Sequence, residues 1–187
     1  MEKQRCGWCK GDPLYEAYHD VEWGAPVKDD DTLFEFLVLE TFQAGLSWIT
    51  ILKKRENFRK ALDNFDYRKI ARYEESKIQA LLNDAGIIRN KLKVGATVSN
   101  ALAFMKVQDE FGSFSDYVWS FVNHSPIKNR VENYKNGPAT TEISDALSKD
   151  LKKRGFKFVG STVTYAFMQA VGMVNDHEIS CFRYEQV

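Results

Sequence analysis

The chain has 187 residues, and its 26 Lys and Arg residues balance 26 Asp and Glu residues, so its formal net charge at pH 7 is zero. A hydrophobic content of 44% and an aromatic content of 13% are typical of a folded globular protein and exclude a disordered chain. The balanced charge gives no bulk electrostatic support for binding to nucleic acid or to a membrane, so any such contact must come from a local patch.

The predicted elements of the first half are helices. Asp12 before Pro13 is typical of an N-cap followed by proline at the first helical position, and predicts a short helix to about His19. The negative cluster at 29–31 suits the N-terminus of a second helix, which we expect to end near Gly45. Ser47 is expected to cap the next helix. The further helices expected here cover residues 48–62, 67–73 and 74–83.

Helices also dominate the second half. A long helix is expected over 89–111, after Gly86, and a further helix over 115–122. The polar segment 126–141 predicts an exposed, mobile loop. Ser144 is expected to cap a helix that ends before Gly155, and another helix begins near Gly160. The apolar residues expected on the long helix are Leu92, Val98, Leu102 and Met105. Strand-like alternation is nearly absent, so the predicted fold class is all-α.

The chain shows no internal repeat, low-complexity tract or linker, which favours a single domain over residues 1–187. Two lobes are expected within it, one formed by 1–30 together with 140–187 and the other by the helices of 31–139. The first twenty residues contain no apolar run, and no later stretch approaches a membrane span. We therefore expect a cytoplasmic protein without a signal peptide.

Two pairs of metal-ligand residues lie near opposite ends of the chain. Cys6 and His19 form the first pair, and His177 and Cys181 form the second. Residues four apart on a helical turn lie on one face at about 5 to 6 Å, close enough to bind one ion. Two thiolates with two imidazoles complete a tetrahedral zinc site, which would be structural because no coordination position stays open. The spacing alone leaves open that Cys6 is a surface thiol and His177 a solvated loop residue.

Glu40 is an acidic residue in an otherwise apolar predicted helix. Leu33, Phe36 and Leu37 share its side of the helix, so it lies on or beside the buried face. A buried carboxylate is either paired within the protein or available to a ligand. Aromatic residues in the N-terminal part favour a flat cationic ligand such as a methylated purine, although they are equally consistent with core packing. These residues are Trp8, Tyr15, Tyr18, Trp23 and Trp48.

The segment 152–161 is expected to end one helix, turn tightly and begin the next. Backbone N–H groups at the N-terminus of a helix bind a DNA phosphate without sequence specificity, and adjacent lysines add attraction. Glycine and lysine are also ordinary capping residues, so the pattern by itself does not require DNA. The residues assigned to DNA contact are Gly155, Lys157, Gly160 and Ser161.

Short motifs spread over nearly the whole chain occur together: Arg5-Cys6-Gly7-Trp8, Asp12-Pro13-Leu14-Tyr15, Tyr18-His19-Asp20, Glu22-Trp23-Gly24, Gln43-Ala44-Gly45-Leu46-Ser47-Trp48, Leu52-Lys53-Lys54-Arg55-Glu56, Asp84-Ala85-Gly86-Ile87-Ile88-Arg89, Trp119-Ser120-Phe121, Lys153-Arg154-Gly155-Phe156 and Val174-Asn175-Asp176-His177. Their joint occurrence is highly specific, and with it the chain resembles the 3-methyladenine DNA glycosylase I family.

The resemblance implies a compact helical glycosylase fold with a helix-hairpin-helix element, and one structural Zn²⁺ per chain that joins the two terminal segments. The implied zinc ligands are Cys6, His19, His177 and Cys181. It also implies that Glu40 is the catalytic carboxylate that contacts the flipped base. The residues implied around that base are Tyr15, Tyr18 and Trp48, with Trp8 and Trp23 lining the pocket.

The activity implied by this resemblance is that of a monofunctional base-excision repair glycosylase. It would flip 3-methyladenine out of alkylated double-stranded DNA and release the free base by hydrolysis, as a monomer without membrane contact. A zinc-stabilised DNA-binding module without catalysis and a glycosylase for other alkylated purines are the alternatives. The wider superfamily usually places a catalytic aspartate beyond the hairpin. Asp176 lies in that region but beside a metal ligand, so it is not assigned as the base.

Overall fold

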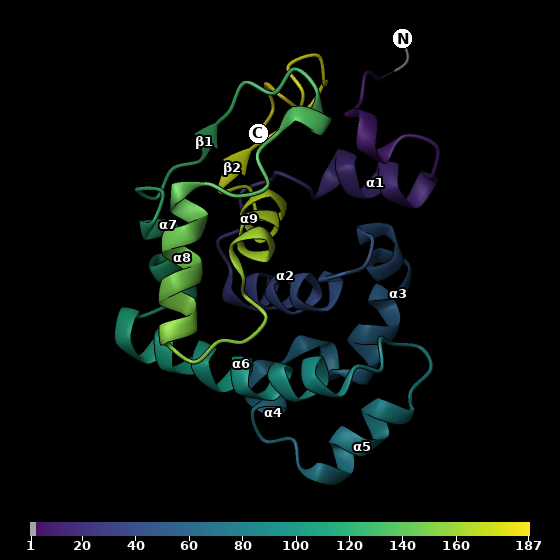
Figure 1. The fold of residues 1–187 in the computed structure, drawn as a ribbon, viewed down its shortest axis with the longest axis vertical. Helices are drawn as coiled ribbons and strands as arrows, with labels where there is room; N and C mark the ends of the chain where they lie inside the picture. Colours follow the sequence, from purple (N-terminus) through teal and green to yellow (C-terminus); the bar gives the residue numbers. More distant parts are fainter. Residues whose placement is uncertain (1–2) are drawn as a thin grey trace.

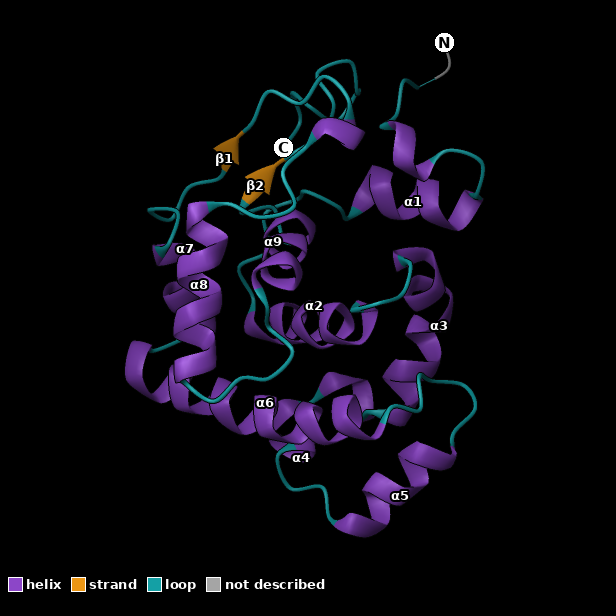
Figure 2. Cartoon of the chain, in the orientation of Figure 1, coloured by secondary structure: helices purple, strands orange, loops and turns teal. Residues whose placement is uncertain are grey.

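In the computed structural model, which describes residues 3–187, helices run throughout the chain and only four residues form strands (Figures 1 and 2). The N-terminal segment begins with the 3₁₀ helix η1 (Gly7–Cys9), followed by α1 (Pro13–Val21). The carboxylate of Asp12 accepts hydrogen bonds from the backbone N–H groups of Leu14 and Tyr15, at 3.0 and 3.3 Å. These bonds confirm the predicted cap at the start of α1.

The central element is α2 (Asp30–Gln43), which Figure 1 shows between α9 above it and α6 below it. Its residues from Leu33 to Phe42 are buried except Glu35, so the helix is surrounded by protein on nearly every side. A helix that is apolar all round belongs in a core. This position buries Glu40 as well, with 3% of its surface exposed.

The helices of the lower part of the molecule follow α2 in the chain. They are α3 (Trp48–Ala61), η2 (Asp63–Phe65), α4 (Tyr67–Ile70), α5 (Glu75–Asn83), α6 (Lys91–Phe111) and α7 (Phe114–Ser120). All the predicted helices of this region are present, and each end lies within three residues of the expected one. Asp30, the first residue of α2, joins that helix to α7, because its carboxylate accepts hydrogen bonds from the backbone N–H groups of Phe114 and Ser115.

Two of the four apolar residues expected on α6 face away from the core. Leu92 and Leu102 are 73% and 47% exposed, whereas the buried face carries three polar residues besides its apolar ones. Lys93 donates through its Nζ to the carbonyl oxygens of Phe42 and Ala44, at 2.9 and 2.6 Å. These carbonyls end α2 and have no partner within that helix, so a lysine is buried here to satisfy them. The other two expected residues, Val98 and Met105, pack against the core, so the apolar pattern was right for half of the residues it named.

The segment between α7 and α8 is more ordered than an irregular loop. It contains β1 (Ile127–Lys128), which pairs in parallel with β2 (Val174–Asn175), and the 3₁₀ helix η3 (Tyr134–Asn136). Val131 forms a further parallel bridge with Glu178. The polar composition correctly indicated an exposed segment, but these backbone pairs with the C-terminal region were not predicted.

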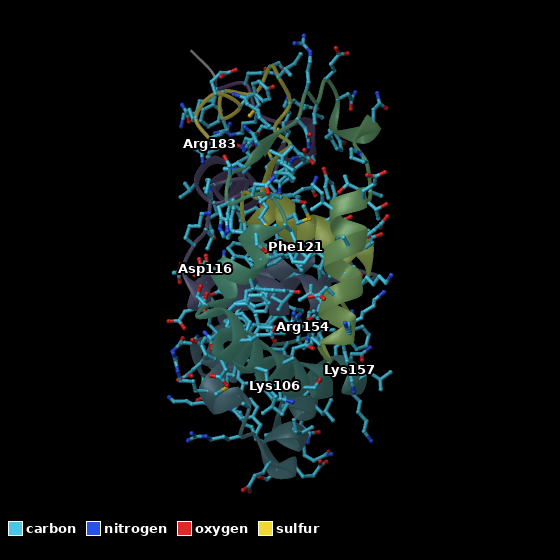
Figure 3. The ribbon with its side chains drawn as sticks, turned by 90° about the vertical axis from the view of Figure 1, so that its left-hand side faces the viewer. Lys106, Asp116, Phe121, Arg154, Lys157 and Arg183 are labelled. Atoms are coloured by element: carbon cyan, nitrogen blue, oxygen red, sulfur yellow. The ribbon has the colours of Figure 1, made fainter. Side chains whose placement is uncertain are left out.

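Two helices close the fold, α8 (Glu142–Lys153) and α9 (Ser161–Ala170). The N-cap of α8 is Thr141, and Ser144 is the third helical residue of the same capping box, so the predicted cap was three residues too late. Gly155 follows the end of α8 with a φ of +96°, as expected for a glycine at that position. Figure 3 labels Arg154 and Lys157 in the turn between the two helices.

The turn after α9 passes close to the segment after α1. The backbone N–H of Val27 donates to the carbonyl of Val171 at 3.0 Å, and the Trp119 side chain donates to the carbonyl of Val27 at 2.8 Å. The first bond joins the N-terminal part of the chain to the C-terminal part, and the second joins the same N-terminal segment to α7. Within residues 3–187, no helix is both long and apolar enough to cross a membrane.

Gly172 is required for this close approach. Its φ is +73°, and a Cβ there would lie 2.5 Å from backbone atoms of Ala25 and Pro26. We expect Gly172→Ala to lower the free energy of unfolding by about 2 kcal/mol or more, measured by urea unfolding. The control is Gly95→Ala on α6, where a Cβ meets no neighbour within 4 Å. It should raise the free energy of unfolding by about 0.5–1 kcal/mol. Equal stability of the two variants would contradict this account.

Candidate active site and metal centre

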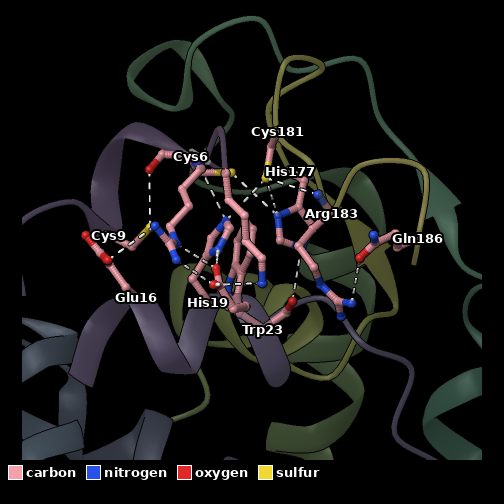
Figure 4. Close-up of polar contacts among 12 residues, drawn as sticks. Cys6, Cys9, Glu16, His19, Trp23, His177, Cys181, Arg183 and Gln186 are labelled. Carbon is pink, nitrogen blue, oxygen red and sulfur yellow. Dashed lines mark hydrogen bonds and ion pairs between the residues drawn. The ribbon is translucent and has the colours of Figure 1, made fainter. Parts of the chain in front are cut away.

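Four buried side chains from the two ends of the chain meet in one place (Figure 4). They are Cys6, His19, His177 and Cys181, and their ligand atoms lie within 4.8 Å of one another. The Sγ of Cys6 is 3.5 Å from Nδ1 of His177, and the Sγ of Cys181 is 3.4 Å from Nε2 of His19. A tetrahedral zinc with bonds of about 2.3 Å to sulfur and about 2.0 Å to nitrogen separates S and N by about 3.5 Å. The donor geometry therefore fits a tetrahedral metal ion.

Neighbouring groups hold the two imidazoles in the orientation that a metal needs. Nδ1 of His19 lies 2.9 Å from a carboxylate oxygen of Asp20, which accepts two hydrogen bonds from Arg5 at 2.8 and 2.9 Å. Nε2 of His177 lies 3.1 Å from the carbonyl oxygen of Trp23. In each case the ring nitrogen that faces away from the cluster donates outward, so the other nitrogen directs its lone pair at the remaining ligand atoms, as metal binding would require.

The two thiols also fit a metal. The hydrogen bond between Cys6 and Cys181 raises the pKa of Cys6 far above its ordinary value, and burial adds to this shift. Hydrogen bonds from Cys6, His177 and His19 lower the pKa of Cys181. Backbone N–H groups of Glu178 and Arg183 donate to the two sulfurs, at 3.3 and 3.4 Å. A divalent cation in place of the shared proton would stabilise both thiolates.

A cavity of about 240 Å³ lies beside this cluster. Its walls come from η1, α1, α2, α3, η3 and α9, so elements far apart in the sequence surround one space. The cavity suits a ligand smaller than a typical drug molecule, for which pockets of about 300 Å³ or more are usual. All the ring residues assigned to the pocket line it, and so does Glu40. The other lining residues are Gln43, Val131, Tyr134, Gly137, Ala166, Gln169 and Asp176.

Glu40 is the unusual residue of this cavity. Within residues 3–187 its Oε2 has no hydrogen-bond partner, and the same is true of Nε1 of Trp48. Burial raises the pKa of Glu40 to about 8, so the carboxyl group is largely protonated at neutral pH. An unpaired acid and an unpaired indole N–H beside one small cavity are positioned to meet hydrogen-bonding groups of a ligand.

The aromatic rings form two groups in the cavity wall. Trp8 packs edge-on against Tyr15 and Trp23, with ring centroids 4.8 and 5.0 Å apart. Tyr18 and Trp48 form the second pair, at 5.5 Å. Burial raises the pKa of Tyr15 to about 12, with a smaller contribution from nearby charged groups that include Glu40 and Tyr134. Tyr15 therefore stays neutral at physiological pH.

The metal cluster and the cavity share chain segments. Trp8 follows Cys6 by two residues and Trp23 follows His19 by four, so two ligands are directly linked to two walls of the cavity. The carbonyl of Trp23 also accepts the hydrogen bond from the ring of His177. The geometry of the cluster consequently sets the positions of both tryptophans.

A second carboxylate in the cavity was not expected as a lining residue. Asp176 accepts hydrogen bonds from Tyr165, Gln169 and Asn129, at 2.6, 2.8 and 2.7 Å. In contrast to Glu40, it is fully partnered, and it joins α9, β2 and the segment after β1. From the sequence, Asp176 was noted only as a neighbour of His177. Its hydrogen-bond partners lie seven to 47 residues away in the chain, so no local pattern indicates them.

The hairpin residues lie outside the cavity. The backbone N–H of Lys157 donates to Oδ1 of Asn100 at 2.8 Å, which holds the turn against α6. The hydroxyl of Ser161 is 2.8 Å from that of Ser144 and donates to Asp145 at 2.5 Å, so its side chain is already engaged. Gly160 is the N-cap of α9 and Lys157 is exposed. An anion could therefore bind the backbone N–H groups in the first turn of α9 and the ammonium group of Lys157.

Comparisons with known proteins agree with this geometry. The family model of the methyladenine glycosylases matches residues 8–184. DNA-3-methyladenine glycosylase 1 of Escherichia coli (strain K12) is 52% identical over 181 residues, which cover 97% of each chain.

Solved structures give the same result. A crystal structure of a 3-methyladenine DNA glycosylase I matches with a TM-score of 0.93 at 52% identity, covering 96% of this chain and 98% of that one. A variant of a 3-methyladenine DNA glycosylase I, crystallised in complex with 3-methyladenine, matches with a TM-score of 0.92 at 36% identity and covers 95% of this chain and 96% of its own. The chain belongs to the methyladenine glycosylase family.

Proposed function

We propose that this protein is a base-excision repair glycosylase that releases 3-methyladenine from alkylated DNA. The single observation that carries the proposal is the unpartnered, buried Glu40 in a small aromatic cavity. Relatives named for this activity, and a relative crystallised with 3-methyladenine, support the same substrate. The alternative of a zinc-stabilised DNA-binding module without catalysis leaves both the cavity and its acid unexplained.

Glu40 is proposed to recognise the base. An adenine alkylated at N3 within DNA is cationic, and a cation beside the carboxyl group stabilises its ionised form. The proton then leaves Glu40, and the carboxylate accepts hydrogen bonds from the amino group of the base. A neutral adenine offers no such charge, so it does not offset the cost of ionising a buried carboxyl group. The pocket thereby selects the alkylated base over normal ones.

The aromatic walls supply the rest of the binding energy. Tyr18 and Trp48 stand as one pair, and Trp8, Tyr15 and Trp23 as the other group. A flat cationic base is attracted to such rings by stacking and by cation–π interaction. The nucleotide has to leave the duplex to reach them, which costs unstacking energy that this binding offsets.

The reaction is a monofunctional hydrolysis. Water attacks C1′ of the sugar as the bond between C1′ and N9 breaks, and the electron pair of that bond neutralises the cationic purine. One proton of the water passes to solvent, and free 3-methyladenine and an abasic sugar are the products. Because the alkylated base is already a good leaving group, the protein contributes mainly by selecting, extruding and orienting the nucleotide.

The turn between α8 and α9 is proposed as the helix-hairpin-helix element that grips the DNA backbone. Gly155 and Gly160 leave the backbone accessible, and the first turn of α9 at Ser161 offers N–H groups to a phosphate. Exposed Lys157 adds attraction without sequence specificity.

We further propose that the metal is one structural Zn²⁺ per chain, held by the four-residue cluster. The chain then works as a single catalytic unit, with residues 1–30 and 140–187 in one lobe and 31–139 in the other. We also propose that it acts as a monomer. The three cysteines form no disulfide, and a cysteine binds zinc only in its reduced form. Both features support a cytoplasmic location.

Substitution of Glu40 tests the proposed role directly. Methylated duplex DNA is incubated with wild type, Glu40→Gln and Glu40→Ala, and released bases are separated by chromatography. We expect the rate of 3-methyladenine release to fall by about tenfold to a hundredfold in both variants, because the charge-assisted contact is lost. Glu75→Gln, an exposed glutamate on α5, is the matched control. Undiminished release by the Glu40 variants would refute the role of this residue.

The same assay separates an enzyme from a binding module. Hot alkali cleaves DNA only where abasic sites have formed, so wild type should generate alkali-labile sites in methylated DNA. If other alkylated purines are released as fast as 3-methyladenine, the narrower substrate assignment is wrong.

The pKa of Glu40 also predicts a pH-dependent stability. A carboxyl group with a pKa of about 8 when folded and about 4.3 when unfolded stabilises the fold at low pH. That contribution is complete below the unfolded pKa and is lost as pH rises through about 8. Glu40→Gln removes the effect. Its advantage in unfolding free energy over wild type should therefore grow by about 3–4 kcal/mol between pH 5 and pH 8, measured by urea unfolding. An advantage independent of pH would contradict the raised pKa.

Metal analysis tests the cluster. Purified wild type should contain one zinc per chain, and Cys181→Ala should contain almost none. Cys9→Ser is the control, since Cys9 is buried next to Cys6 but lies outside the cluster and should keep its zinc. Loss of zinc should lower the melting temperature and weaken binding of 3-methyladenine, because Trp8 and Trp23 lose their anchor. Substoichiometric zinc in folded wild type would overturn the assignment.

A further inference from the structure

One wall of the cavity comes from the segment between β1 and α8, which the proposed mechanism does not use. Val131, Tyr134 and Gly137 line the cavity from this side. In Figure 1 the segment runs in green from β1 across the top of the molecule and carries a short helix toward the purple N-terminal part. That helix is η3, and Tyr134 is its first residue.

The ring of Tyr134 is packed against the chain next to the metal cluster. A Cβ at Gly7 would lie 2.8 Å from Cε1 and 3.2 Å from Cδ1 of Tyr134, so the ring lies directly over the Gly7 backbone. The hydroxyl group is close enough to Tyr15 to contribute to the raised pKa of that residue. Tyr134 therefore stands beside the ring group of Trp8 and Tyr15 inside the cavity wall.

Glu178 holds this arrangement in place. One of its carboxylate oxygens accepts the backbone N–H of Tyr134 at 2.9 Å, and the other accepts the backbone N–H of Gly7 at 3.0 Å. The backbone of Ile179 donates to the carbonyl of Val131 at 2.8 Å, next to the bridge between Val131 and Glu178. Because Glu178 directly follows His177, the residues that anchor η3 are continuous with the metal ligands.

We infer that Tyr134 is a further substrate-contacting residue, whose ring closes the base pocket on the side of η3. The inference rests on the proposed function. The ring is 38% exposed in the free protein, so it retains apolar surface that a base in the cavity can cover. It extends the wall formed by Trp8 and Tyr15, whereas Tyr18 and Trp48 form the other pair.

Binding of the free base tests this inference apart from DNA binding. The affinity for 3-methyladenine is measured by calorimetry for wild type, Tyr134→Ala and Tyr134→Phe. We expect the alanine variant to bind about tenfold more weakly, since stacking of one aromatic ring on a base contributes on that scale. The phenylalanine variant keeps the ring and should bind within about twofold of wild type. Glu132→Gln, an exposed residue of the same segment that does not line this cavity, should bind as wild type.

A double-mutant cycle separates contact from a general structural effect. Gly7→Ala forces the Tyr134 ring away from its position without removing any group that touches the base. It should weaken binding severalfold in the wild-type background and have no effect in the Tyr134→Ala background. Additive losses would show that Gly7→Ala acts elsewhere, and they would contradict the proposed position of the ring.

The outcomes also separate this inference from the proposed function. If wild type releases and binds 3-methyladenine but Tyr134→Ala binds it equally well, the contact is refuted and the function stands. If wild type neither binds nor releases the base, the proposed function fails and the inference fails with it. Melting temperatures of all variants are measured in parallel. If Tyr134→Phe binds 3-methyladenine as weakly as Tyr134→Ala, the ring alone does not make the contact, and the inference is contradicted.

Discussion

A carboxyl group without a hydrogen-bond partner among the described residues is buried at the centre of this protein. Its ionisation there would cost several kcal/mol, and burial raises the pKa of Glu40 to about 8 instead. Natural folds keep such a group only where the surrounding structure holds it firmly. Here α2 is buried on nearly all sides, and Lys93 from α6 satisfies the carbonyls at its end. The fold thus keeps this acid beside the cavity without a donor of its own.

The second organising feature is the cluster of two cysteines and two histidines. It joins the first twenty residues of the chain to the last eleven. Residues that line the cavity lie close to its members in the sequence or contact them in space. Trp8 and Trp23 connect to it on one side, and Glu178 on the other. Glu178 in turn fixes η3 through Tyr134. A metal at this position would therefore act on the shape of the pocket without entering the chemistry, because all four ligands come from the protein.

The sequence predicted most of the helices and the four residues of the cluster. The predictions failed where polar contacts between distant segments determine the orientation or pairing of an element. The capping signals at Asp12 and Gly155 are local, so they were readable. On α6 the apolar pattern indicated Leu92 and Leu102 as core residues, but both are exposed. Lys93 faces inward instead, since the end of α2 needs a donor there. The pairing of β1 with β2 was likewise missed, because two-residue strands carry no periodic signal.

The sequence by itself determined the helical class, the candidate metal ligands, the acid at position 40 and the supply of aromatic rings. These follow from residue types, spacings of three and four, and short motifs, all of which act within one helix or turn. Only the tertiary structure decided which of these groups share a cavity. It brought Asp176 and Tyr134 into the cavity wall. It also gave the Asp176 carboxylate hydrogen-bond partners and left Oε2 of Glu40 without one. The physical reason is that hydrogen-bond partners of Asp176 and Tyr134 come from segments up to 47 residues away, which no local pattern encodes.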